Sequence, residues 1–176
     1  MNLTKRIIAQ LEQLTTEGFL EAEAAQLPDG GYFVGVVAEK GEPTVAITLE
    51  AYDRFSVMLR CLEVAYDNLA GQTQPDDLLQ QADRIAQRLT YLEEPLALVE
   101  LDSEAKLAQL RSAPPHQEGE TLTYWELLLW TEPHPRARLT RYCWTPGQTE
   151  RELVVYPATF ATVGRIAQDL AANLQI

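Results

Sequence analysis

Apolar residues recur every three or four positions in four stretches of the chain, which is the spacing of an amphipathic helix. Gly18 follows the first stretch and Pro75 opens the third, as expected for a helix end and a helix start. The spacing predicts helices over residues 3–15, 51–69, 75–92 and 157–174. In the second stretch, Phe55, Leu59 and Leu62 are expected on the buried face.

Apolar and polar residues alternate in the remaining ordered stretches, which is typical of strands with one buried face. Strands are expected over residues 19–27, 32–39, 44–49, 95–102, 121–130, 136–144 and 150–156, with a short helical turn over 104–110 and a polar loop over 111–120. Short turns rich in glycine and proline, such as "PDGG" and "TPGQ", favour antiparallel neighbours. The predicted fold class is therefore α+β, an antiparallel sheet of about six to seven strands with amphipathic helices packed on it.

A length of 176 residues predicts one α+β domain spanning residues 1–176. An internal duplication of strands followed by a helix stays open, with halves 17–70 and 95–176 and the 75–92 helix between them. A shift of 105 residues lays Phe55 on Phe160, Arg60 on Arg165, Asn68 on Asn173 and Leu69 on Leu174.

The net charge of −12 is concentrated in the first part of the chain, where residues 1–102 hold 18 acidic and 7 basic side chains. Such acidity disfavours general nucleic-acid binding, and it favours solubility and basic partners. Cys61 and Cys143 lie in apolar segments, which suits free thiols in a reducing cytoplasm. The first 25 residues contain no long apolar run, so neither a secretory signal nor a membrane span is expected.

No stretch of the chain carries a catalytic or cofactor motif. His116, His134, Cys61 and Cys143 do not fall at the short spacing of a zinc site. The chain also lacks a Gly-x-Ser-x-Gly elbow and a glycine-rich phosphate loop. We therefore expect no metal and no cofactor, and an enzyme is the least favoured class.

Candidate binding residues lie in a window of an otherwise acidic chain that contains no acid, from Pro133 to Thr149. Alternation along 136–144 places four candidates on one face of the strand: Arg136, Arg138, Tyr142 and Trp144. Arginine and aromatic residues are enriched in protein interfaces and in single-strand nucleic-acid platforms. Two alternatives remain at this point, because the face could be open or covered by a helix.

Glu126 interrupts the apolar run "YWELLLW" and is expected to be half-buried. A buried acid needs a partner, and an arginine from the neighbouring strand is the simplest candidate.

The expected order of helix, three strands, helix, then strands and helix resembles the secretion-chaperone-like fold. That resemblance implies a small, acidic, usually dimeric protein that binds unfolded or partly folded segments of a partner. The weak repeat and the basic–aromatic strand are similar instead to the Whirly-like single-strand nucleic-acid binders. The favoured hypothesis is a non-enzymatic cytoplasmic protein-binding factor of chaperone or assembly type, with a homodimer left open. The alternative is a single-stranded nucleic-acid-binding module.

Overall fold

The computed structural model describes residues 2–18, 24–36, 39, 41–67 and 75–174. Within these residues, three helices accompany one antiparallel sheet of eleven strands, so the α+β class is confirmed. The predicted number of strands, six to seven, is too low. The helices are α1 (Leu3–Glu17), α2 (Pro75–Arg88) and α3 (Phe160–Leu174). The strands are β1 (Ala24–Gln26), β2 (Tyr32–Val36), β3 (Thr44–Tyr52), β4 (Ser56–Ala65), β5 (Leu96–Asp102), β6 (Leu107–Ser112), β7 (His116–Glu118), β8 (Thr121–Trp130), β9 (Arg136–Trp144), β10 (Glu152–Leu153) and β11 (Tyr156–Thr159).

Eight of the strands form the main path of the sheet, in the order β1-β2-β3-β4-β9-β8-β6-β5. One row of directly opposed residues crosses all eight: Ala24, Val34, Ile47, Leu62, Leu139, Leu127, Leu110 and Leu98. The six inner members of this row are fully buried. The row fixes the register of the sheet, because a slip of one residue would turn a strand's apolar set to the wrong face.

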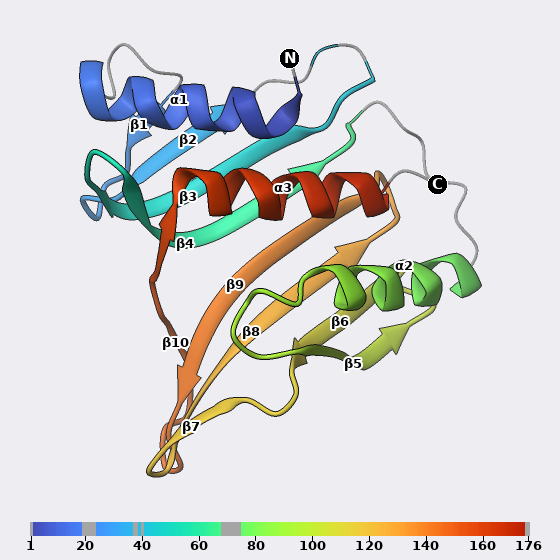
Figure 1. Ribbon diagram of the computed structural model, residues 1–176. Helices are drawn as coiled ribbons and strands as arrows, with labels where there is room; N and C mark the ends of the chain where they lie inside the picture. The colour runs from blue at the N-terminus through green and yellow to red at the C-terminus, as the bar shows by residue number, and fades with distance from the viewer. Residues whose placement is uncertain (1, 19–23, 37–38, 40, 68–74, 175–176) are drawn as a thin grey trace.

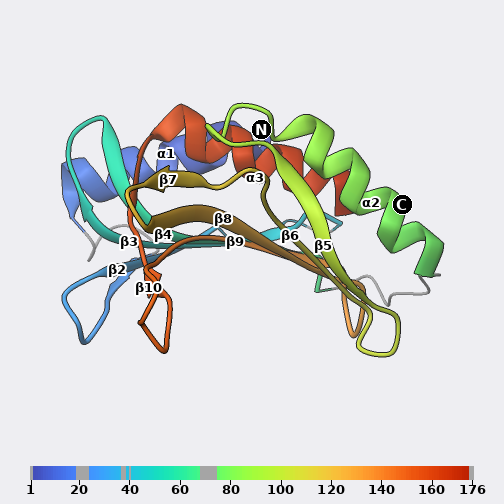
Figure 2. The same ribbon diagram turned by 90° about the horizontal axis from the view of Figure 1, so that it is seen from below.

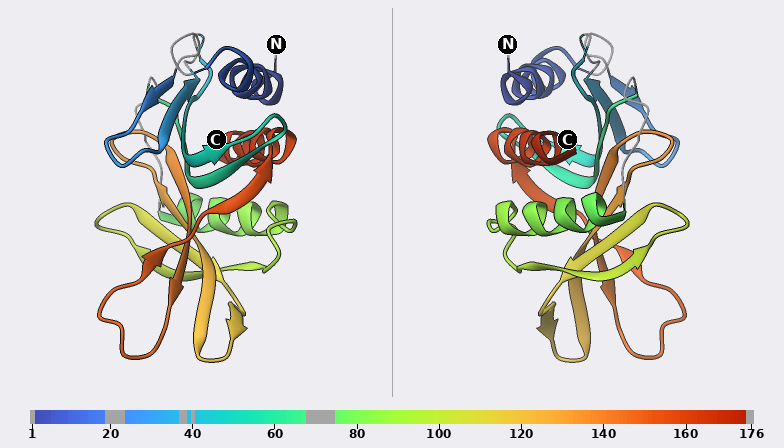
Figure 3. Two further views of the ribbon diagram at one scale, coloured as in Figure 1. Left: turned by 90° about the vertical axis from the view of Figure 1, so that its left-hand side faces the viewer. Right: turned by 90° about the vertical axis from the view of Figure 1, so that its right-hand side faces the viewer.

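All three helices lie on one side of the sheet, which we call the inner face (Figures 1 and 2). On the opposite side, the outer face, none of the described residues forms a helix (Figure 3). The buried stripes of the helices meet the apolar row of the strands in a single core. Helix α1 begins at Asn2, whose side chain accepts a hydrogen bond from the Lys5 backbone, and it ends at Gly18 as predicted.

The main path consists of two units of the same plan. Helix α1 precedes β1–β4 in the first unit, and α2 precedes β5, β6, β8 and β9 in the second. The units meet where β4 pairs with β9, and α3 packs against both strands from the inner face. The buried apolar residues of α1 are Leu3, Ile7, Leu11 and Leu14, and those of α2 and the turn after it are Leu78, Ala82, Ile85, Leu89 and Leu92. The structure therefore contains a repeated topology, with each unit led by its helix.

The predicted helix over 51–69 is wrong, because β3 runs to Tyr52 and β4 occupies 56–65. The side chain of Asp53 accepts hydrogen bonds from the backbones of Phe55 and Ser56, and this closes a turn between the two strands. Thr48 pairs with Cys61 and Leu49 with Leu59, so Arg60 is an extra residue in β4. A bulge of this kind shifts the alternation by one residue, so Leu59 and Leu62 are three apart and mimic a helix.

Phe55 was expected in the core but is 72% exposed at the tip of that turn. Leu59 and Leu62 are buried, as predicted, and Phe160, Val163 and Leu170 of α3 are buried as well. The 105-residue alignment no longer matches like with like, because it places strand β4 over helix α3. The repeated topology seen in the structure has different boundaries, because α2 belongs to the second unit instead of separating the two halves.

Several further segments differ from the predictions. The strand expected over 150–156 is divided, because β10 covers only Glu152–Leu153 and β11 begins at Tyr156, and the helix expected over 75–92 ends at Arg88. The helical turn expected over 104–110 is wrong, because residues 107–112 form β6, which pairs between β5 and β8. The loop expected over 111–120 contains β7 and the end of β6. Strands β8 and β9 have the predicted bounds, whereas α3 begins three residues later than expected. The strand expected over 19–27 lies mostly outside the described residues, with 24–26 forming β1.

Candidate interaction surface on the outer face

The four candidate residues of β9 lie on the outer face of the sheet. Their partners across the pair with β8 are Trp130 for Arg136, Leu128 for Arg138, Tyr124 for Tyr142 and Leu122 for Trp144. The structure does not gather the four into one compact site, because Arg136 and Trp144 are eight positions apart, about 27 Å along a strand. They fall into two groups, one at each end of β9.

The first group surrounds Trp130. The Arg136 guanidinium lies 4.3 Å from the centre of the Trp130 ring, and that of Arg138 lies 5.5 Å from it. Arg138 also donates to Glu63 on β4 at 2.7 Å, and this hydrogen bond raises the pKa of Arg138. Arg136 has no carboxylate within salt-bridge distance among the described residues. Arg136 is therefore stacked on an aromatic ring without a carboxylate partner among those residues.

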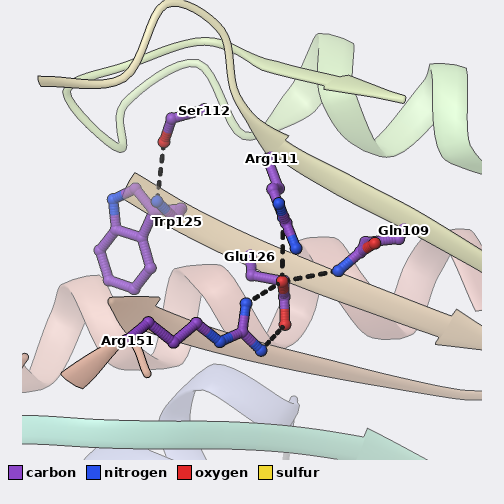
Figure 4. Close-up of polar contacts among 6 residues, drawn as sticks. All are labelled: Gln109, Arg111, Ser112, Trp125, Glu126 and Arg151. Atoms are coloured by element: carbon purple, nitrogen blue, oxygen red, sulfur yellow. Dashed lines mark hydrogen bonds and ion pairs between the residues drawn. The ribbon is translucent and has the colours of Figure 1, made fainter. Parts of the chain in front are cut away.

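The second group is centred on Glu126, which is only 2% exposed (Figure 4). Arg151 donates to both carboxylate oxygens, and Arg111, directly opposite on β6, donates through Nε at 3.1 Å. Gln109 adds a third donor at 2.6 Å. The expectation that an arginine from the neighbouring strand partners Glu126 is confirmed. Burial alone raises the pKa of Glu126, but hydrogen bonds and charges from Arg151 and Arg111 outweigh it and hold the pKa below its ordinary value.

Two tyrosines extend this second group. The ring centres of Tyr124 and Tyr142 are 6.2 Å apart, and the Arg151 guanidinium lies 3.7 Å from the centre of the Tyr142 ring. Arg111 lies 5.4 Å from the centre of the Tyr124 ring. The arginines that hold Glu126 therefore also stack on the aromatic side chains of the outer face.

Exposed apolar side chains and a pocket complete the outer face. Leu153, opposite Tyr142 on β10, is 47% exposed, and Phe33 on β2 is 40% exposed. A pocket of about 310 Å³ opens beside Trp144, lined by Arg111, Ser112, Pro115, Leu122, Tyr124 and Trp144. Large exposed apolar groups beside arginine and aromatic rings are characteristic of interaction surfaces.

Arg141 lies opposite Trp125 on the inner face, and it is 6% exposed. Its two terminal nitrogens donate to the two carboxylate oxygens of Glu94, each at 2.9 Å. The Ser112 hydroxyl donates to Glu94. It also accepts from the Trp125 backbone N–H, a hydrogen bond drawn in Figure 4. A buried arginine held in this way stabilises the structure and is not accessible to a partner.

No three His, Cys, Asp or Glu side chains gather as metal ligands in the part of the chain that the structure describes. Cys61 and Cys143 are free thiols. Over the same residues, no helix has the length and apolarity needed to cross a membrane. Comparison of the chain with protein-family models, curated proteins and solved structures found no match.

Sequence reasoning missed Arg111, Arg151 and Leu153 as members of this surface. The predicted loop over 111–120 includes Arg111. The need of Glu126 for a cationic partner from a neighbouring strand was the one signal that could have identified this arginine. Leu153 belongs to the short strand β10, and Arg151 directly precedes it. This strand folds back along β9 after the "TPGQ" turn. Too few residues pair there for alternation to reveal the side on which they lie.

Proposed function

We propose that this chain is a non-enzymatic protein-binding factor of chaperone or assembly type that docks its partner on the outer face. The observation that carries the proposal is the sheet face without a helix among the described residues, on which arginines stack on aromatic rings. The exposed Leu153 lies opposite Tyr142 on this face, and the exposed Phe33 lies on the same face at β2. A protein of this kind would act in the cytoplasm, where free thiols such as Cys61 and Cys143 persist.

The charges of the outer face favour a protein over a nucleic acid. Arg111 and Arg151 share Glu126, and Arg138 is bound to Glu63. Phosphate groups would have to compete with the carboxylates paired with these arginines, of which Arg111, bound through Nε alone, keeps its terminal donors. They would also approach a chain with a net charge of −12. Apolar contacts with the rings require no such exchange, so a protein segment is the better match.

The partner that fits best is a protein segment with apolar side chains and at least one carboxylate. The apolar side chains would cover Trp130 and Leu153. The carboxylate would pair with Arg136, which is stacked on the Trp130 ring and has no carboxylate partner among the described residues. Removal of water from an arginine stacked on an aromatic ring strengthens both the stack and the ion pair. Such residues are frequent hot spots of protein interfaces.

A single-stranded nucleic-acid-binding module remains the second candidate. The Trp130–Arg136 stack and the neighbouring Tyr124 and Tyr142 rings favour it, since bases stack on such rings while an arginine contacts phosphate.

Affinity capture from the native host with two matched double variants tests the proposal. Trp130→Ala with Arg136→Ala removes an arginine and the ring beneath it from the outer face. Arg54→Ala with Phe55→Ala removes an equivalent pair, 5.5 Å apart, from the exposed β3–β4 turn. We expect a recurrent protein to be captured by the wild type and by the turn variant, and to be lost with the outer-face variant.

Capture of the same protein by both folded variants would contradict the docking surface. Recovery that disappears on nuclease treatment would favour the nucleic-acid alternative. Sedimentation of the wild type and the outer-face variant adds a third outcome. A dimer that dissociates in the outer-face variant would make a second copy of the chain the occupant of this face, against the proposal.

A further inference from the structure

The pocket beside Trp144 has walls of two chemical kinds. Leu122, Tyr124, Pro115 and the Trp144 indole provide apolar walls, and Arg111 provides a charged one. Its volume of about 310 Å³ is at the lower end of the range for small-molecule sites, which suits one large side chain or a small acid.

The apolar walls are held in place by contacts outside the pocket. The indole N–H of Trp144 donates to the carbonyl of Gln148 at 3.2 Å, and the Gln148 side chain accepts from the Thr145 backbone at 3.0 Å. Leu122 lies directly opposite Trp144 across the β8–β9 pair. A ring fixed in this way loses little conformational entropy on binding, which favours affinity.

The charged wall carries an excess of positive charge. Arg111 and Arg151 are two cations that share the single carboxylate of Glu126, so the group as a whole is cationic. Arg111 binds Glu126 through Nε, and its side chain is 40% exposed. An arginine held by Nε keeps the donors of its terminal nitrogens for a second acceptor.

We propose that this pocket is an anchor site for one large apolar side chain carried next to a carboxylate, supplied by the partner segment. The apolar side chain packs between Trp144, Leu122 and Tyr124, and the carboxylate accepts from Arg111. The inference rests on the proposed function and assigns the chemistry of one subsite on the same face. It adds that the partner is anchored at the Trp144 end of β9 as well as at Arg136.

The test uses 3-phenylpropanoate as the probe and its neutral amide, 3-phenylpropanamide, as the matched control. Amide and indole N–H resonances of the full-length protein are followed by NMR during each titration. We expect the acid to shift the resonances of Leu122, Tyr124 and the Trp144 indole, and to bind about tenfold more tightly than the amide.

Three folded variants localise the effect. Trp144→Ala should abolish binding of both probes, whereas Arg111→Gln should bring the affinity for the acid down to that for the amide. Trp130→Ala, at the far end of the outer face, should leave both affinities unchanged. Equal affinities for acid and amide in the wild type, or resonance shifts confined to another site, would overturn the inference.

Failure of this test is distinguishable from failure of the proposed function. If the probes do not bind but the Trp130–Arg136 variant still loses its partner, the anchor pocket is refuted and the docking face stands. If the acid binds as expected but no outer-face variant loses a protein, the pocket is a small-acid site and the proposed function fails.

Discussion

Leu62 on β4 and Leu139 on β9 lie directly opposite each other, and neither side chain is exposed to solvent. They occupy the centre of the apolar row that crosses eight strands, where the two helix-and-four-strand units meet. Helix α3 covers the junction of β4 and β9 from the inner face (Figure 1). The two leucines thus pack at the junction where the two units meet.

Leu62→Ala should lower the free energy of unfolding by about 2–5 kcal/mol, because it opens a cavity at this junction. Denaturant unfolding followed by circular dichroism measures the change. Phe55→Ala, at an exposed position that helical periodicity had assigned to the core, should change stability by less than about 0.5 kcal/mol. Similar losses in both variants would show that the 53–55 turn is packed and that β4 is misplaced.

Glu93 and Glu94 are adjacent acids that we expect to differ strongly in their contribution to stability. Glu94 binds buried Arg141 through both oxygens, whereas Glu93 is 60% exposed at 3.6 Å from the same arginine. Glu94→Gln should cost about 3–5 kcal/mol, since the buried cation loses its bidentate partner and keeps only the more distant, exposed Glu93. Glu93→Gln should cost less than about 1 kcal/mol. Equal losses in thermal or denaturant unfolding would contradict the buried position of Arg141.

Glu126→Gln should destabilise the protein by about 1–3 kcal/mol at pH 7, because two arginines lose a charged acceptor. The pKa of Glu126 is lower in the folded chain than when unfolded, so its carboxylate stabilises the fold above about pH 4.3, the ordinary value. That contribution is lost as the pH falls through the lower folded pKa.

The pH dependence gives a second measurement on the same variant. The stability difference between wild type and Glu126→Gln should be constant at neutral pH and should shrink below about pH 4.3. Glu120→Gln, which changes an exposed acid in the β7–β8 turn, serves as the control and should show no such dependence. A difference that grows on acidification would mean that burial dominates and that the Glu126 pKa is raised.

The paired arginines of the outer face also predict how the chain responds to a labelled single-stranded oligonucleotide. In the described part of the face, Arg136 lacks a carboxylate and Arg111 keeps its terminal donors, so log K against log salt should have a slope no steeper than about −1.5. Fluorescence anisotropy over a salt series measures it. Tight binding with a slope near −3, as expected if all four arginines contacted phosphate, would instead support the nucleic-acid module.

The periodicity of the chain was sufficient to predict α1, α2, β8 and β9, because each is a regular element with one buried face. It failed at β4, where the extra residue Arg60 gives the spacing of Leu59 and Leu62 a helical appearance. It failed again at β6, where Leu107 and Leu110 are three residues apart although Ala108 is the buried neighbour of Leu110 on the inner face. Local spacing cannot detect a bulge, because the partner strand defines it.

Only the part of the candidate surface that lies within the single strand β9 could be predicted from the sequence. Alternation along β9 placed Arg136, Arg138, Tyr142 and Trp144 on one face, and the pairing with β8 confirms that shared face. The division into two groups follows from the length of the strand. Arg138 pairs with Glu63 because β9 lies beside β4, where the two units meet. A pattern within one strand cannot predict that pairing.

Site-specific photo-crosslinking in the native host tests the docking of a protein partner on the outer face most directly. A crosslinkable phenylalanine analogue is placed at Leu153 on the outer face, and in a second strain at Leu79 on α2. Both side chains are exposed and apolar, at 47% and 39%. The account predicts one recurrent protein adduct from position 153 that free 3-phenylpropanoate diminishes, and no such adduct from position 79. An adduct from position 79 alone, or the same adduct from both positions, would contradict a partner docked on the outer face.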